Sequence, residues 1–302
     1  MKTKLEYQMM RKKEKEATEH ASEILEANGM MSAPIDPFEV AAAESRGLKL
    51  VGADLKEHCD GQLEYDKELD LFILFYNTKY DVGLPEGRHH PRTRFSIAHE
   101  LGHFFLENHR AYLMQSGSTH SSQGEFASKD LMEREADAFA AGLLMPLQLF
   151  REAVNQDELS IEYIRTVADI FETSFVSTAI RSVQNSDFPC ELVGIRDGEI
   201  AWRFRPSGNR DPLKEGGLYR SSNGKFSSKN LKKKWQEFED KIYTEECLQG
   251  TPQDWFKLYG PVSKEIDVWE HYLSVPSMNT LLVLLTVSEE ELFETEEEEY
   301  NE

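Results

Sequence analysis

The sequence predicts an α+β protein in three folded parts: an N-terminal domain over residues 1–147, a small helical unit over 148–186, and a strand-rich C-terminal domain over 189–288. Helix-spaced apolar residues prevail before position 186, with a few short strand patterns among them. After Pro189, alternating apolar residues and an Asp-Gly turn indicate strands. The Glu-rich residues 289–302 can bury little surface, so we expect an acidic disordered tail.

The N-terminal domain opens with a long helix, expected over Lys4 to Asn28, and a short helix over Phe38 to Ser45. Strand patterns follow at Leu48–Val51, Gly61–Tyr65 and Leu71–Tyr76. The last pattern is apolar throughout, which predicts a well-buried strand. A small sheet therefore precedes the chemically informative part of the chain.

That part runs from Phe95 to His109, in which His99, Glu100 and His103 form His-Glu-x-x-His. Two histidines four apart on a helix stack on one face, where they can bind one metal ion. Zinc lowers the pKa of a bound water to about 7. Glu100, beside the pair, could take the proton of that water and pass it to a leaving group. His109, six residues after His103, is not expected on the ligand face.

The residues around the motif favour a helix, because apolar side chains recur at helical spacing. Gly102 lies inside this helix, where glycine costs about 1 kcal/mol relative to alanine. A small residue there suggests that another backbone packs close. The alternative is chance, since His-Glu-x-x-His also occurs in proteins without metal, and a third ligand is needed to decide. The stripe consists of Ile97, Ala98, Leu101, Phe104 and Phe105.

The candidate third ligand lies in a second helical run, from Leu131 to Pro146. Glu133 and Asp137 are four apart and therefore project to one side. Glu133 can complete a His-His-Glu site whose fourth position is open to water. Asp137 can accept the second ring N–H of a ligand histidine and so fix its tautomer. Glu135 better fits an exposed acidic face, and it is the alternative ligand.

The two motifs together resemble the ImmA/IrrE family of zinc metallopeptidases. The resemblance rests on Ala98-His-Glu-Leu-Gly-His103 and on the segment from Glu133 to Pro146. It extends upstream to the helix ending near Gly29, to Pro34–Ala41 and to the strand before Arg94, and downstream to about residue 205. It implies a zincin-like domain of the gluzincin type with Zn²⁺ as cofactor. It also implies His99, His103 and Glu133 as ligands and Glu100 as the catalytic base.

The same resemblance implies peptide hydrolysis in a narrow substrate, since members of the family are linked to helix-turn-helix repressors that they inactivate by cleavage. The expected partner is thus a basic DNA-binding repressor. An alternative of another class is a non-catalytic zinc-containing regulatory module that binds and sequesters a protein partner. A zinc hydrolase for a non-peptide bond, or manganese as the working metal, also fits the motif.

Composition narrows the partners further. Lys and Arg number 34 and Asp and Glu 55, giving a net charge of −21. So acidic a surface repels phosphate backbones, which argues against direct nucleic-acid binding and favours a basic protein partner. The three cysteines form no metal or disulfide pattern, which favours a reducing compartment. With no signal-peptide or membrane-span pattern, we expect a soluble cytoplasmic protein.

The rest of the chain carries weaker signals. Leu159–Phe171 and Ser174–Val183 predict two short helices that resemble a helix-turn-helix. Arg181 is the only base on the second, so we interpret the pair as a packing unit and not as a DNA reader. Glu191–Arg196 and Glu199–Phe204, joined by Asp-Gly, predict a β-hairpin.

Overall fold

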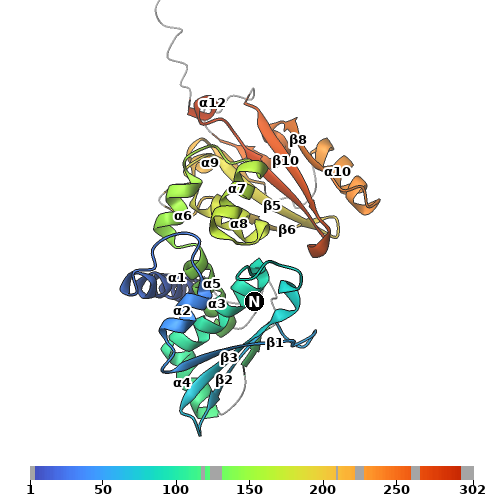
Figure 1. Ribbon diagram of the computed structural model, residues 1–302. Coiled ribbons are helices and arrows are strands. Elements are labelled where there is room, and N and C mark those ends of the chain that lie inside the picture. The colour runs from blue at the N-terminus through green and yellow to red at the C-terminus, as the bar shows by residue number, and fades with distance from the viewer. Residues whose placement is uncertain are drawn as a thin grey trace, which may run out of the picture. The chain divides into compact units, whose positions relative to one another are not determined.

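A computed structural model describes residues 4–116, 120–122, 131–208, 210–221, 228–259 and 266–293. The chain is α+β, as the sequence predicts. It divides into two compact units (Figure 1). Unit 1 comprises Met1–Phe150 and Ala168–Ser174, and unit 2 comprises Arg151–Val167 and Phe175–Glu302.

Unit 1 is built on a four-stranded sheet in the order β1-β3-β2-β4. β1 pairs with β3 in parallel, whereas β2 is antiparallel to both β3 and β4. Apolar residues of β2 and β3, such as Leu63 and Leu74, are fully buried, because these strands form the inner part of the domain core. The strands are β1 (Leu48–Ala53), β2 (Gly61–Asp66), β3 (Leu71–Asn77) and β4 (His120–Ser122).

Helices supply the rest of that core. Their buried residues, including Leu25, Ile97 and Leu143, form one cluster with the sheet. The site described below lies on two of these helices, α3 and α5. The helices are α1 (Lys4–Ala27), α2 (Pro37–Ala43), α3 (Pro91–Phe105), α4 (Glu107–Ser116) and α5 (Leu131–Leu144), with a 3-10 turn η1 (Thr78–Asp81).

Three helices follow in the region predicted to be a small helical unit. They are α6 (Leu147–Val154), α7 (Ile161–Phe171) and α8 (Phe175–Asn185). Apolar residues on α7 and α8, among them Ile164 and Val183, are fully buried. The buried faces agree with the packing interpretation of these helices.

Unit 2 is centred on an antiparallel five-stranded sheet in the order β6-β5-β11-β10-β8. The predicted hairpin is present as β5 and β6, and its Asp197-Gly198 turn has positive φ at both residues, as a tight hairpin turn requires. β11 is apolar and central, with six of its seven residues buried. The strands are β5 (Cys190–Arg196), β6 (Glu199–Phe204), β8 (Glu245–Gly250), β10 (Val268–Val275) and β11 (Thr280–Thr286).

Short elements complete unit 2. α10 packs on the sheet core through Leu231 and Phe238. β7 and β9 form a separate antiparallel pair. These elements are α9 (Pro212–Glu215), β7 (Leu218–Arg220), α10 (Lys229–Glu239), α11 (Pro252–Trp255), β9 (Phe256–Leu258), η2 (Pro276–Met278) and α12 (Glu289–Phe293).

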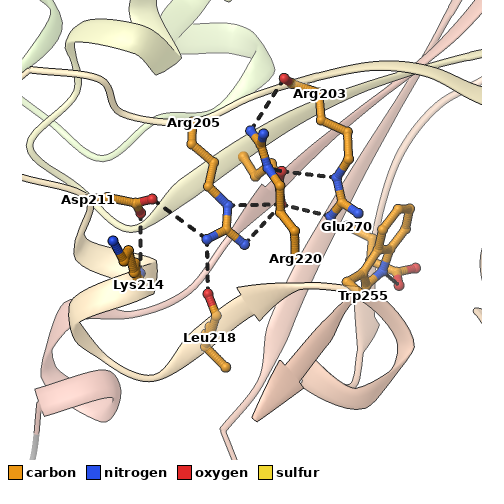
Figure 2. A network of polar contacts seen from close by, with 9 residues as sticks. Arg203, Arg205, Asp211, Lys214, Leu218, Arg220, Trp255 and Glu270 are labelled. Carbon is orange, nitrogen blue, oxygen red and sulfur yellow. Dashed lines mark hydrogen bonds and ion pairs between the residues drawn. The ribbon is translucent and has the colours of Figure 1, made fainter. Parts of the chain in front are cut away.

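A buried carboxylate organises the polar part of unit 2. Glu191 on β5 is fully buried and accepts hydrogen bonds from three arginines that converge on it (Figure 2). Arg203 is bidentate, with nitrogen-oxygen distances of 2.9 and 2.7 Å, and Arg220 donates at 2.7 Å. Arg205 donates to the same carboxylate and to the carbonyl of Leu218. The cluster joins β5, β6 and β7, and a buried carboxylate left without such partners would strongly destabilise the fold.

The predicted acidic tail needs a correction at its start. Residues Glu289–Phe293 form α12, and Leu292 is buried in the unit 2 core. Acidic residues dominate the composition of this segment, so the sequence gives little indication that Leu292 packs into a core. Residues 294–302 lie outside the described residues. Among the helices that the structure describes, none combines the length and apolarity that crossing a membrane requires.

Candidate metal centre

The metal centre is built on α3, whose start is fixed by local capping. His90 is the N-cap residue, and its Nδ1 accepts a hydrogen bond of 3.1 Å from the backbone N–H of Arg92. Pro91 occupies the first helical position, where its missing N–H costs nothing. The helix then buries nearly every residue from Thr93 to Phe104, so the histidine pair is held in a packed helix and not in a loop.

A close crossing brings α5 to this helix. A Cβ placed on Gly102 would lie 3.1 Å from Cα and 3.2 Å from the carbonyl oxygen of Ala136. Only glycine allows so short an approach of two helix backbones, which confirms the expectation from the sequence. Glu133 lies one helical turn before Ala136. The crossing therefore delivers its carboxylate to the histidine pair.

Three side chains converge as the sequence predicts: His99, His103 and Glu133 form a group that could hold a metal ion. The two Nε2 atoms are 3.2 Å apart. Glu133 oxygens lie 3.5 Å from Nε2 of His99 and 3.6 Å from Nε2 of His103. Tetrahedral zinc with bonds of about 2.0–2.1 Å needs donor atoms about 3.3 Å apart. The donor set and its spacing thus fit a tetrahedral ion with one open position.

His99 is oriented by Asp137, whose Oδ1 lies 2.9 Å from its Nδ1. Burial disfavours the charged imidazole, but hydrogen bonds to Asp137 and Glu133 outweigh it and raise the pKa of His99 to about 10 in the metal-free chain. The negative charge of Glu100 acts in the same direction. Asp137 thus occupies the place predicted for it, as acceptor for the ring nitrogen that faces away from the ligand group.

His103 has a different outer partner, one that the sequence interpretation dismissed. Nδ1 of His103 lies 3.1 Å from Nδ1 of His109, and Nε2 of His109 lies 2.8 Å from Oε2 of Glu135. Glu135 is therefore neither an exposed surface residue nor one of the three grouped ligands. A single continuous helix would turn His109 away from the ligand face. Leu106 instead adopts an extended backbone between α3 and α4, and the chain turns back.

Glu100 is fully buried, and it faces the start of β2. A Cβ on Gly61 would lie 3.0 Å from Cγ and 3.1 Å from Oε1 of Glu100. The charge of Glu100 contributes to raising the pKa values of His99 and of Cys59. The carboxylate is thus in electrostatic reach of the ligand group while lying against the sheet.

The nearby basic residues mostly have structural roles. Arg94 is buried, donates to the backbone carbonyls of Ile35 and Glu172, and pairs with the Glu172 carboxylate. Arg92 is held by Asp60 through two hydrogen bonds of 2.9 and 2.7 Å. His89 contacts Asp81 at 2.7 Å and stands apart from the metal group.

The Gly- and Ser-rich segment between α4 and α5 is predicted from the sequence to be a loop over the site, and it falls largely outside the described residues. Of this loop, the structure describes the end of α4 and the backbone of β4, which pairs with Gly61–Leu63 of β2. His120 in this loop is a candidate oxyanion donor by its position in the sequence, with a surface histidine as the stronger expectation, and its side chain lies outside the described residues. Its role stays a prediction.

A small mixed sheet with a His-His-Glu group on two crossing helices defines a metallopeptidase-type fold. The family described as Peptidase M78, IrrE N-terminal-like domain, matches residues 43–182, which include α3, α4 and α5. This match supports the resemblance of residues 43–182 to the ImmA/IrrE family.

A solved structure extends the likeness beyond that domain. The chain is similar to a Mycobacterium tuberculosis transcriptional regulator with 14% sequence identity and a TM-score of 0.50, covering 90% of this chain and 87% of that one. At this identity the likeness concerns the fold alone. No curated protein matches the chain.

Proposed function

We propose that this protein is a zinc-dependent endopeptidase that cleaves a specific protein substrate, a basic helix-turn-helix repressor. The observation that carries the proposal is the convergence of His99, His103 and Glu133 with Glu100 next to the pair on the same helix. A structural zinc site would usually fill its fourth position with a protein ligand and needs no adjacent carboxylate. Three ligands and a neighbouring carboxylate are what hydrolysis requires.

Each residue of the metal centre has its own role in the proposed hydrolysis. His99 and His103 present Nε2 lone pairs, and Glu133 presents its carboxylate oxygens. When bound, zinc would supply Lewis acidity to a water and to the substrate carbonyl. Glu100 takes the proton from the attacking water and delivers it to the leaving amine. Its burial excludes bulk solvent, which strengthens these electrostatic interactions.

The sheet offers a way to hold the substrate. β4 is the outermost strand on the β2 side, and its partner β2 starts at Gly61, against Glu100. An extended peptide can add to such an edge through backbone hydrogen bonds. We place the substrate backbone along this edge, one strand away from the base.

The substrate class rests on charge and on the family. A net charge of −21 attracts a basic partner and steers its approach. DNA-binding repressors are basic where they contact phosphates. Such a partner is bound as a protein, since the acidic surface disfavours nucleic acid itself.

The test compares the native protein with Glu100→Gln, both loaded with zinc and incubated with an extract of the producing cells. New N-termini are then labelled and identified. We expect a cut within a basic DNA-binding protein, present with the native enzyme and absent with the variant. Retained cleavage by Glu100→Gln would overturn the mechanism. A partner that is bound by both proteins and cut by neither would favour the non-catalytic sequestering module.

A further inference from the structure

We infer that His109 and Glu135 are positioning residues that hold the proton of His103 on Nδ1 and so keep its Nε2 lone pair available for the metal. This inference rests on the metal site of the proposed function. It concerns two residues that lie outside the His-Glu-x-x-His motif and outside the group of three ligands.

The contacts form a chain from α5 through α4 to α3. Glu135 on α5 contacts Nε2 of His109 at 2.8 Å, and Nδ1 of His109 contacts Nδ1 of His103 at 3.1 Å. Nε2 of His103 then faces Nε2 of His99 and the Glu133 carboxylate. The contacts from Glu135 through His109 and His103 to His99 are all within hydrogen-bond distance.

The chemistry of the groups fixes the direction of the protons. An imidazole that binds a metal through Nε2 carries its proton on Nδ1, so a metal-binding His103 donates to Nδ1 of His109, and His109 then presents its own N–H at Nε2 to the Glu135 carboxylate. Nδ1 of His109 is then an acceptor, and it requires a proton on Nδ1 of His103. A neutral imidazole with its proton on Nδ1 has its lone pair on Nε2. One carboxylate thus sets the tautomer of the ligand two steps away.

Burial makes this control effective. The side chains of His103 and His109 are each 1% exposed and that of Glu135 is 11% exposed, so water has little access to compete for these bonds. His99 has a shorter arrangement, a direct contact with Asp137, whose side chain is 34% exposed. The three acidic residues of α5 thus differ in their contacts: Glu133 belongs to the ligand group, Asp137 contacts His99, and Glu135 contacts His109.

The test uses two variants that fail in different ways. His109→Leu removes the acceptor for His103. Glu135→Gln keeps the shape, but its amide can either accept from or donate to His109, so both tautomers become available. Zinc affinity is measured by competition with a chelator, and the tautomer of His103 by ¹⁵N chemical shifts in the metal-free protein. The matched control is Glu14→Gln, which removes the negative charge paired with Arg134, the residue before Glu135, and leaves a neutral acceptor in its place.

We expect about 10- to 100-fold weaker zinc binding for His109→Leu, as for other outer partners of metal ligands, and a smaller loss for Glu135→Gln. His103 should carry its proton on Nδ1 in the native protein and show mixed tautomers in Glu135→Gln, while Glu14→Gln matches the native protein. If His109→Leu does not fold, the nearly isosteric Glu135→Gln carries the test alone.

Native zinc affinity together with an unchanged His103 tautomer in folded Glu135→Gln would overturn the inference. The proposed function fails separately, if the native protein binds no metal or cuts no substrate. The tautomer measurement needs neither metal nor substrate. It therefore judges the positioning role in either case.

Discussion

Gly102 of α3 lies against Ala136 of α5 so closely that a Cβ on the glycine would stand 3.1 Å from the Cα of the alanine. This contact sets the separation of the two helices that carry the ligands. His103 follows Gly102 directly, and Glu133 precedes Ala136 by one turn. The fit of the metal site therefore depends on a glycine that is not itself a ligand.

Gly102→Ala tests this dependence. Alanine gains about 1 kcal/mol of helix propensity, but overpacking costs about 1–3 kcal/mol, and the neighbour is backbone that cannot rotate away. We expect a net loss of up to about 2 kcal/mol in unfolding free energy, and weaker zinc binding. Urea unfolding of the metal-free protein and a chelator competition measure the two effects. A more stable variant with native zinc affinity would contradict this account of the crossing.

Gly61→Ala tests how the side chain of the catalytic base Glu100 is positioned. An alanine Cβ in its ideal position would lie 3.0 Å from Cγ of Glu100. This distance is too short, so the Glu100 side chain would be displaced. Zinc content should stay native, because the ligands lie elsewhere, while kcat falls. A 1 Å misplacement can cost about 100-fold in rate. Unchanged kcat in the zinc-loaded variant would show that Glu100 tolerates this shift or has another role.

Metal binding should depend on pH through His99. Its pKa is raised to about 10 in the metal-free chain, so at neutral pH the ring holds a proton that coordination must displace. Zinc affinity should therefore fall as pH falls, by about tenfold per unit from about pH 8 to about pH 6.5. Calorimetry in two buffers of different ionisation enthalpy measures the released proton.

Asp137→Asn is the matched variant for that measurement. The hydrogen bond to Asp137 is the largest of the effects that raise the pKa of His99. Asparagine keeps an acceptor but removes the negative charge, so the pKa of His99 should fall and the proton release at neutral pH should be smaller. Identical release in the native and variant proteins would argue against His99 as the proton source.

Glu191 in unit 2 is predicted to be essential for stability. Its replacement by leucine leaves the buried guanidinium groups of Arg203 and Arg205 without their carboxylate. Breaking a buried ion pair from one side costs about 3–5 kcal/mol. Glu215→Gln, which removes an exposed pair with Arg210, should cost less than about 1 kcal/mol. Equal urea midpoints for the two variants would show that the buried cluster adds little.

Much of this architecture could be predicted from the sequence, because the signals are local. Helix-spaced apolar residues mark α3 and α5, and Asp197-Gly198 marks the β5–β6 hairpin. The four-residue spacings that place His99 with His103, and Glu133 with Asp137, depend only on helix geometry. Gly102 predicted the close contact with another helix because glycine has no Cβ and so allows two backbones to approach.

The missed features are the ones that depend on a break in regular structure or on distant pairing. His109 reaches His103 because the backbone of Leu106 is extended, and no local pattern predicts that turn. Glu135 could be interpreted only once His109 was placed. The parallel pairing of β1 with β3, across β2 in sequence, is likewise a tertiary outcome.

The most direct test of the central claim is the metal content of the native protein, His103→Ala and Glu133→Ala, measured by elemental analysis. The account predicts about one zinc per native chain, none retained in His103→Ala and weakened retention in Glu133→Ala. A native protein without metal, or a His103→Ala variant that keeps its zinc, would contradict the site and the hydrolysis built on it.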